Sequence, residues 1–377
     1  MGTGTVRRFT KRFFVIANMF VALLFIVSCY GWWFNPLHFW YIGLITLGAF
    51  YLLVLLLFFI LFWMFVNFKY SLISIVVVLI CWTPIGELIG LNANKKFNLE
   101  KTPSAIRVMS WNVEHFDIVR AKTDRTVKNE MLQTINTYAP DVACFQEMVA
   151  SDKFPKAIHY LPKITEVLRM PYVHYSFNKD LDFDGDHHFG IITLSKYPII
   201  STHTLSYTPN DYNSIFQYVD IVKNEDTVRV FNTHLQSLKF TKENLQYLAD
   251  PEQEAVDSAI GLSKNIAAKF RAGFIKKKWQ SERLAIAIAK SPYPVIVCGD
   301  FNDVPNSYAY HTIGRNLQNS FAEKGSGMGR TFANISPTLR IDNIFADKRF
   351  SITQYTRVKK KMSDHFPIIT DLVLKPN

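Results

Sequence analysis

Three long apolar segments fill the first 90 residues of this chain, and they constrain its fold more than any other feature. They cover about residues 13–30, 40–66 and 71–90, and the only charge within them is Glu87, near the end of the third. Each approaches or exceeds the roughly 20 apolar residues that cross the hydrocarbon core of a bilayer. We therefore expect residues 1–90 to form a three-helix transmembrane segment.

The residues around these segments predict how they are oriented. Basic residues tend to stay on the cytoplasmic side, and aromatic residues gather at the membrane surface. A basic cluster precedes the first segment, Lys69 lies between the second and third, and the first loop is aromatic. Three crossings would place everything after residue 90 on the outer side. The residues concerned are Arg7, Arg8, Lys11 and Arg12 in the cluster, and Trp32, Trp33, Phe34, His38 and Trp40 in the loop.

Two other interpretations of this region stay open. Residues 1–29 also resemble a signal peptide, and 26–29 (IVSC) resembles a lipoprotein cleavage box. Two more apolar segments follow at once, however, which favours membrane helices over a cleaved leader. Alternatively, the second and third segments form a re-entrant hairpin, and the remainder of the chain would then face the cytoplasm.

The remainder of the chain has the composition of a globular domain. We expect a polar linker over 91–103 and one domain over 104–377. The whole chain has a net charge of +11, and leaving out the five basic and one acidic residues of 1–90 gives 37 basic and 30 acidic residues, a net +7. A mildly basic domain suits an anionic substrate. The basic run Lys276–Lys278 lies in a predicted helix and is typical of a solvated helix face.

Apolar runs and helical periodicity alternate along this domain, which indicates a layered α/β fold. Expected strands cover 106–112, 142–147, 189–199, 214–222, 227–231, 295–298, 340–346 and 366–374, with a polar loop over 182–188. Expected helices cover about 126–138, 251–290 and 308–317.

Polar residues cluster where these strands end or begin. The clearest case is 295–305 (VIVCGDFNDVP), in which a buried strand delivers Asp300, Asn302 and Asp303 directly after a glycine. Taken alone, this pattern also fits an Asx-type turn. Similar polar groups occur at the ends or starts of other expected strands. Because strand ends and strand starts can share an edge of a mixed sheet, we expect these groups to lie on one common rim. Carboxylates, imidazoles and carboxamides there would suit a divalent cation and acid–base chemistry. These groups are Asn112, Glu147, His234 and Asp300 at strand ends, and Asp342, Asp364 and His365 at or before strand starts.

The chain resembles the endonuclease/exonuclease/phosphatase superfamily, which has the DNase I-like fold, in six short motifs that occur in the family's order. They are SWNVE (110–114), FQE (145–147), NTH (232–234), GDFND (299–303), RID (340–342) and SDH (363–365). The resemblance covers about residues 104–375. It implies a four-layer α/β sandwich of two central sheets flanked by helices, and hydrolysis of a phosphoester bond with Mg²⁺, or with Mn²⁺ in its place. The N-terminal layout also resembles membrane-anchored members from Bacteroidota-type bacteria, which implies a multi-pass protein of the bacterial inner membrane with a periplasmic catalytic domain.

The resemblance also implies roles for individual residues. Metal ligands would be Asn112, Glu147 and Asp364. Asp300 would orient or deprotonate the attacking water, Asn302 would hold that water or the phosphate, and His234 would donate to a phosphoryl oxygen. Asp342 would support a catalytic histidine or the leaving group, and His365 would contact the phosphate. Glu114 is a departure, because repair nucleases of the family often carry Asp at this position.

These observations favour a membrane-anchored phosphoesterase and leave its substrate open. A nuclease would suit the net +7 and the basic run of the predicted helix, whereas a phospholipid or sphingolipid headgroup phosphodiesterase would suit a domain close to the bilayer. The expected partners are a phosphoester substrate and the lipid bilayer, with no obligate protein partner. A non-catalytic binding protein on the same fold would be expected to lack motif residues, and all are present. Transport by the apolar segments is disfavoured because they carry almost no charge.

Overall fold

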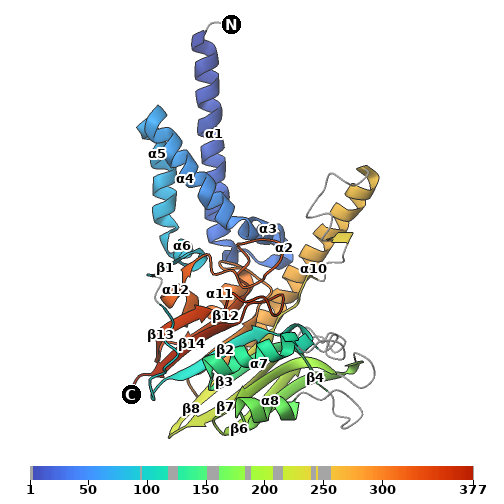
Figure 1. The fold of residues 1–377 in the computed structure, drawn as a ribbon. Helices are drawn as coiled ribbons and strands as arrows, with labels where there is room; N and C mark the ends of the chain where they lie inside the picture. Colours follow the sequence, from blue (N-terminus) through green and yellow to red (C-terminus); the bar gives the residue numbers. More distant parts are fainter. Residues whose placement is uncertain are drawn as a thin grey trace.

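The computed structural model describes residues 3–93, 96–117, 126–150, 161–182, 188–206, 215–238, 243–244 and 256–376. Beyond the N-terminal helices, its described residues form two six-stranded sheets that face each other (Figure 1). The first has the order β13 (Phe350–Arg357), β14 (Ile368–Leu374), β2 (Ile106–Asn112), β3 (Val142–Ala150), β5 (His188–Ser195) and β4 (Tyr172–Asp182). The second has the order β10 (Leu317–Asn319), β12 (Asp342–Asp347), β9 (Val295–Asp300), β8 (Asp226–His234), β7 (Ile215–Lys223) and β6 (Ile199–Ser206).

Each sheet has one parallel pair at its centre, and the other pairings are antiparallel. β2 lies parallel to β3, and β8 lies parallel to β9. Next to each parallel pair, one antiparallel strand starts at the edge where the pair ends: β14 beside β2, and β12 beside β9. Strand ends and strand starts therefore share a rim in both sheets, as the sequence predicted.

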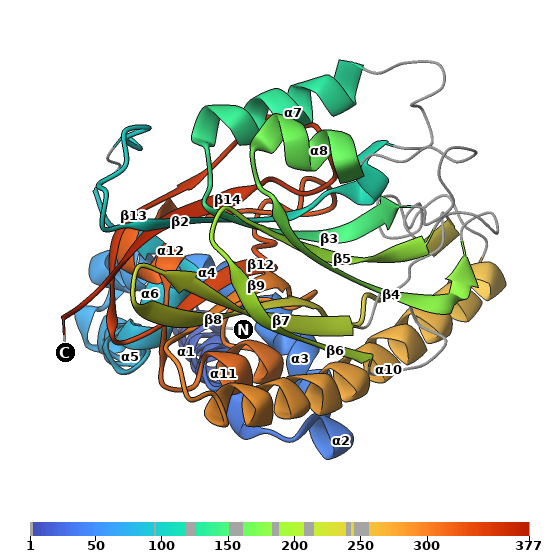
Figure 2. The same cartoon turned by 90° about the horizontal axis from the view of Figure 1, so that it is seen from below.

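Helices cover the outer faces of both sheets (Figure 2). α7 (Thr126–Tyr138) and α8 (Leu161–Leu168) pack on the first sheet, and α10 (Val256–Ala289) and α11 (Tyr308–Gly314) pack on the second. A separate core fills the space between the sheets and includes Val108, Val142, Val230 and Ile296. The expected four-layer α/β sandwich is confirmed. Shorter elements are η2 (Glu114–Asp117) and α12 (Ser320–Lys324).

Four strands of the two six-stranded sheets were not among those expected: β4, β6, β10 and β13. All four lie at the edges of their sheets. An edge strand is covered on one side only, so its sequence carries fewer apolar residues, as ISTHT (200–204) within β6 illustrates. The polar loop expected over 182–188 lies mostly outside the described residues, and its two end residues belong to β4 and β5.

The N-terminal region is helical, with bounds that differ from those expected. The elements are α1 (Thr3–Cys29), η1 (Gly31–Trp33), α2 (Pro36–Phe39), α3 (Tyr41–Leu47), α4 (Ala49–Val66), α5 (Phe68–Ile80) and α6 (Trp82–Leu88). Among the described residues, Val6–Cys29 and Ala49–Val66 are long and apolar enough to cross a membrane, and α5 with α6 is a third candidate if this bent pair counts as one span. These helices indicate association with a membrane.

Two of the expected apolar helices are interrupted. The segment expected over 40–66 is divided at Gly48 into α3 and α4. The segment expected over 71–90 bends by 69° between α5 and α6. Pro84 explains the second break, because a proline has no N–H and its ring clashes with the carbonyl four residues earlier.

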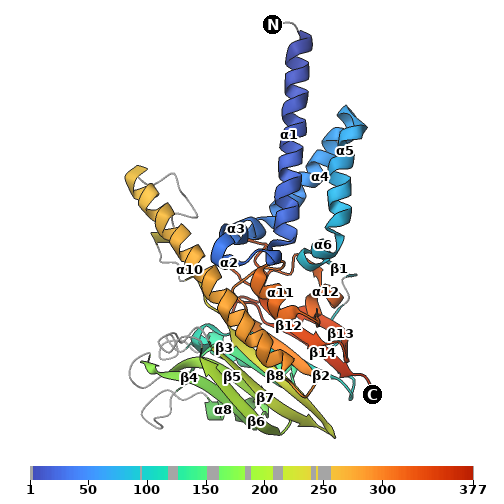
Figure 3. The same cartoon turned by 180° about the vertical axis from the view of Figure 1, so that it is seen from behind.

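The N-terminal helices stand on one end of the sandwich (Figures 1 and 3). β1 (Gly90–Leu91) pairs with β11 (Ser326–Gly327), which fastens the end of the membrane region to the domain. Nδ2 of Asn92 donates to the carbonyls of Ala322 and Gly325 at 3.0 and 3.1 Å. The start of the predicted linker 91–103 is therefore bound to the domain surface.

Candidate active site

Asp300 is the centre of the candidate active site. It ends β9, beside His234 at the end of parallel β8 and opposite Asp342 at the start of antiparallel β12. Asn112 ends β2 in the other sheet, and its Nδ2 donates to Oδ2 of Asp300 at 3.2 Å. Nε2 of His234 lies 3.5 Å from the same oxygen. Both sheets therefore contribute to one cluster around a buried carboxylate.

Gly299 allows β9 to reach this position. Its φ is +152°, and a Cβ built on it would lie 2.0 Å from the carbonyl oxygen of Thr233 on β8. Any side chain at this position would push the two parallel strands apart. The glycine of the GDFND motif is therefore required by the close approach of two backbones.

Glu147 lies within β3 and not at its end, because β3 continues for three residues beyond it. The pairing with β5 shifts register between Phe145 and Met148, and Glu147 has a φ of +51°. An irregularity of this kind redirects a side chain out of the strand's alternation. The carboxylate lies 3.8 Å from Nε2 of His234 and 3.7 Å from Nε2 of His115.

His365 links two of the carboxylates. Its Nδ1 donates to Oδ2 of Asp342 at 2.8 Å, and its Nε2 lies 3.6 Å from Oδ2 of Asp300. Oδ1 of Asp364 lies 4.0 Å from Nε2, and the ring of Phe332 contacts the imidazole edge to face, with centroids 5.0 Å apart. These contacts hold the imidazole in one orientation.

Asn302 follows Asp300 in the loop after β9. It has a φ of +49°, a conformation that Asn tolerates better than most residues. Its backbone N–H donates to Oδ1 of Asp300 at 2.8 Å, and its Nδ2 donates to the carbonyl of Leu235 at 2.9 Å. The carboxamide is therefore oriented from the residue that follows His234.

Burial and neighbouring charges shift the proton equilibria of this cluster. Burial raises the pKa of Asp300, and the charge on Asp342 raises it further, while the two histidines oppose this shift. Burial alone would lower the pKa of His365, but the carboxylates of Asp342 and Asp300 raise it well above its ordinary value. Burial, together with the charges on Glu114, Glu147 and Asp300, raises the pKa of Asp364 to about 6.

All eight predicted site residues belong to this one cluster, although they come from both sheets. Sequence comparison agrees with the family resemblance of the motifs: residues 109–365 match the profile of the endonuclease/exonuclease/phosphatase family. The chain belongs to this family. The predicted superfamily is thus confirmed, and the matched range contains every one of the eight residues. The membrane region, over residues 11–88, matches a domain of unknown function.

Solved structures of the family share the fold. An endonuclease/exonuclease/phosphatase from Beutenbergia cavernae is 20% identical, with a TM-score of 0.52 and 72% of each chain covered. An endonuclease/exonuclease/phosphatase from Bacteroides vulgatus is 16% identical, with a TM-score of 0.51, and the match covers 73% of this chain and 100% of the other. At such identities the likeness concerns the fold alone. No curated protein sequence matches this chain.

The site has the donors that a divalent cation needs, as expected for this family. Ligand atoms of Asp300, Asp342 and His365 lie within 4.8 Å of one another. Among the described residues, Nε2 of His234 and Oδ1 of Asp342 are buried without a hydrogen-bond partner. Unpaired buried polar atoms are costly, so their presence here fits a site that a ligand completes. Most of the donors are carboxylate oxygens, which suit hard cations such as Mg²⁺ or Mn²⁺.

The structure adds His115 to the site and gives Glu114 a contact there. His115 lies beside Glu147, and Oε2 of Glu114 accepts from the backbone N–H of Asp364 at 3.0 Å. Glu114, His115 and Phe116 all have positive φ, so the chain turns sharply over the site. The sequence could have indicated His115 as a site residue only through its position directly after the SWNVE motif. Glu114 had been noted only as a departure from the repair nucleases.

Proposed function

We propose that this chain is a membrane-anchored phosphoesterase that hydrolyses a phosphodiester or phosphomonoester bond by a metal-activated water. The observation that supports this most is the single cluster around Asp300, in which carboxylates and histidines from both sheets meet in a family of phosphoester hydrolases. We also propose the division of the chain into a membrane region over 1–90, a connecting segment over 91–103 and a catalytic domain over 104–377.

Within this proposal, Glu147, Asn112 and Asp364 hold the cation, Mg²⁺ or Mn²⁺. Glu147 suits this role because its carboxylate is 21% exposed and makes only long contacts, at 3.7 and 3.8 Å, with two imidazoles. Asn112 and Asp364 approach from β2 and from the loop before β14. The bound cation would supply Lewis-acid stabilisation of the phosphoryl oxygens and would lower the pKa of a coordinated water.

The chain's own groups supply the remaining chemistry. Asp300 accepts a proton from the attacking water as the new P–O bond forms and the bond to the leaving group breaks. Nε2 of His234, which has no hydrogen-bond partner among the described residues, donates to a phosphoryl oxygen as negative charge develops. His365, oriented by Asp342, contacts the phosphate, and Asn302 holds the phosphate or the water. This division of labour is mainly electrostatic stabilisation by groups that are already in place.

A lipid headgroup phosphoester is the favoured substrate class. Two features of the sequence suited a nucleic acid, the net +7 and the basic helix run, but the structure buries Lys277 and Lys278 of that run. In addition, Gly43 of α3 contacts Phe274 of α10, and α10 contacts the catalytic loop. The loop therefore lies close to the aromatic segment expected at the membrane surface. A nuclease remains the second candidate because of the net charge.

The test uses the full chain in lipid nanodiscs with Mg²⁺ or Mn²⁺ and a panel of DNA, RNA, sphingomyelin, phosphatidylinositol phosphates and a chromogenic phosphodiester. We expect hydrolysis of at least one substrate, loss of activity in chelator, and a loss of about 100-fold or more in Glu147→Gln, because an amide is a poorer ligand for a hard cation. Glu166→Gln, on the exposed face of α8, is the matched control and should retain activity.

A second measurement in the same samples follows Mn²⁺ binding by electron paramagnetic resonance. Glu147→Gln should weaken it and Glu166→Gln should not. Full activity in chelator, or unchanged Mn²⁺ binding by Glu147→Gln, would contradict the metal assignment.

A further inference from the structure

The predicted solvated face of Lys276–Lys278 is wrong for two of the three lysines. Lys277 is 1% exposed and Lys278 is 5% exposed, whereas Lys276 faces solvent. Three consecutive helical residues point in directions about 100° apart, so they cannot all face the same way. A buried lysine is costly unless it is paired, which raises the question of what Lys277 pairs with.

Lys277 binds the catalytic loop directly. Its Nζ donates to the backbone carbonyl of Asn302 at 2.6 Å and lies 3.2 Å from Oδ2 of Asp303. Both carboxylate and ammonium are almost fully buried, and Nζ also lies 4.7 Å from the ring centroid of Phe274. Burial raises the pKa of Asp303, while the Lys277 ammonium lowers it.

The bond from Lys277 is one of three that hold Asn302. The N–H of Asn302 is held by Asp300, its side-chain amide by the carbonyl of Leu235, and its own carbonyl by Lys277. The left-handed φ of Asn302 is less favourable than an ordinary one, so these bonds have to maintain it. Asp300 ends β9 and Leu235 directly follows β8, whereas Lys277 lies on the helix α10.

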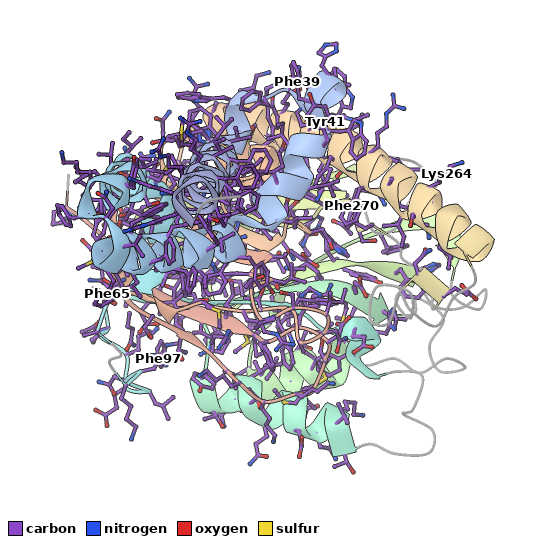
Figure 4. The ribbon with its side chains drawn as sticks, turned by 90° about the horizontal axis from the view of Figure 1, so that it is seen from above. Phe39, Tyr41, Phe65, Phe97, Lys264 and Phe270 are labelled. Atoms are coloured by element: carbon purple, nitrogen blue, oxygen red, sulfur yellow. The ribbon has the colours of Figure 1, made fainter. Side chains whose placement is uncertain are left out.

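The helix that carries Lys277 is in turn packed against the membrane region. A Cβ on Gly43 of α3 would lie 2.7 Å from the ring of Phe274, one helical turn before Lys277. Phe39, Gly43, Phe274, Lys277 and Asp303 line one cavity of about 20 Å³, room for about one water molecule. Viewed from the membrane side, Phe39 and Tyr41 lie beside α10, which carries Phe270 (Figure 4).

We propose that Lys277 is a positioning residue for Asn302, and that the segment 31–46 between the first two apolar helices holds Lys277 in place. This inference rests on the proposed function, because it concerns the site at which hydrolysis would occur. The membrane region is then a part of the catalytic unit, and not only an anchor.

The proposal predicts that Lys277 acts through Asn302. Removing the ammonium deletes a charge-assisted hydrogen bond to the loop and leaves Asp303 buried without its partner. If Lys277 only stabilised the fold, its loss would reduce activity independently of Asn302. If Lys277 positions Asn302, its loss should have little further effect once the Asn302 side chain is gone.

A double-mutant cycle on the full chain in nanodiscs distinguishes these cases, with the chromogenic phosphodiester as substrate. We expect Lys277→Met to lower kcat/KM about 10-fold and Asn302→Ala about 100-fold, and the double variant to resemble Asn302→Ala rather than reach about 1000-fold. The matched control is Lys278→Met, an adjacent buried lysine whose ammonium pairs with Glu282 at 2.8 Å and not with Asn302 or Asp303. The effect of Lys278→Met on kcat/KM should multiply with that of Asn302→Ala. If the effects of Lys277→Met and Asn302→Ala also multiplied fully in the double variant, the proposal would be overturned.

A second variant separates position from stability. Lys277→Met combined with Asp303→Asn removes both buried charges, so the melting temperature should recover towards that of the wild type. The bond to the Asn302 carbonyl stays absent, and we therefore expect kcat to remain low. Recovery of kcat together with the melting temperature would show that the lysine has only a structural role.

Phosphate binding tests the proposal without turnover. Isothermal titration calorimetry of inorganic phosphate in the presence of Mn²⁺ should show weaker binding for Asn302→Ala and for Lys277→Met, and unchanged binding for Lys278→Met. If the wild type hydrolysed the substrate and Lys277→Met bound phosphate as tightly as the wild type, this inference alone would be overturned. If the wild type showed no turnover and bound no phosphate, the proposed function and this inference would both be overturned.

Discussion

At the scale of single residues, the site is organised by one buried carboxylate with many partners. Oδ2 of Asp300 lies within 3.6 Å of an amide and of two imidazoles, and Oδ1 accepts a backbone N–H. A carboxylate held in this way has little freedom to reorient. Such preorganisation is what a general base or a water-orienting group requires.

We expect Asp300→Asn and His234→Ala to lower kcat by about 10²–10⁴-fold each, with much smaller effects on KM. Both residues lie where charge changes during the proposed reaction, and not where substrate is merely held. Steady-state kinetics of the purified full chain measures the two constants separately. A variant that kept a near-normal kcat and lost only affinity would remove its residue from the catalytic group.

At the scale of elements, small departures from regular strands position the site. The register shift in β3 redirects Glu147, and the glycine before Asp300 allows β8 and β9 to approach each other. Polar contacts also join the sheets: Nε2 of Gln146 donates to Oδ1 of Asn232 at 2.7 Å. This bond connects the two halves of the sandwich directly below the cluster.

Gly299→Ala should destabilise the domain, because the added Cβ would collide with the backbone of β8 and not with a flexible side chain. We expect a loss of about 2–4 kcal/mol in the free energy of unfolding, together with loss of activity. Scanning fluorimetry compares the variant with Gly261→Ala, a helical glycine on α10 with open space around it. Equal melting temperatures for Gly299→Ala and the wild type would contradict this account of the strand pair.

Gly43→Val should lower activity although it lies in the membrane region. The larger side chain would push Phe274 away, and with it the helix that carries Lys277. We expect a loss in kcat/KM of about 10-fold, partly restored by Phe274→Leu, because the smaller side chain makes room. Unchanged kinetics in Gly43→Val would show that the catalytic loop is independent of α3.

At the scale of the whole molecule, the membrane region and the sandwich form one extensive contact. The carboxylate of Glu87 in α6 accepts from Tyr310, and its carbonyl accepts from Arg340. The rings of Trp32 and His311 stack with centroids 3.6 Å apart. These contacts involve α11, which packs on the sheet that carries Asp300, and the loop before β12 of the same sheet.

The orientation of the whole molecule in the membrane follows from the number of crossings. Four basic residues before the first apolar segment and three crossings would place the domain outside the cytoplasm. We therefore expect alkaline phosphatase fused after Asn377 to be active and a cytoplasm-dependent fluorescent fusion to stay dark. The reverse pattern would mean that α5 and α6, which are bent by 69°, re-enter the membrane without crossing it.

The amino-acid sequence by itself determined the central strands, the layered class and the candidate residues of the site. Strands covered on both faces are mostly apolar, so β2, β9 and β14 are visible as runs, and the six motifs occur along the chain in a family-specific order. The apolar N-terminal segments were visible for the same reason. A segment that is surrounded by apolar material on all sides has an apolar sequence, so its burial can be predicted from local composition.

Features that depend on a contact with a residue far away in the sequence were decided only by the tertiary structure. The edge strands have half-polar sequences, because solvent covers one side of each. The positive φ of Glu147 arises from pairing with β5, and the burial of Lys277 arises from Asp303, 26 positions later in the chain. A lysine in a helix has the same local sequence signal whether it faces water or a carboxylate. The sequence therefore determined which residues could do chemistry, and the packing of α3, α10 and the two sheets decided which of them lie together.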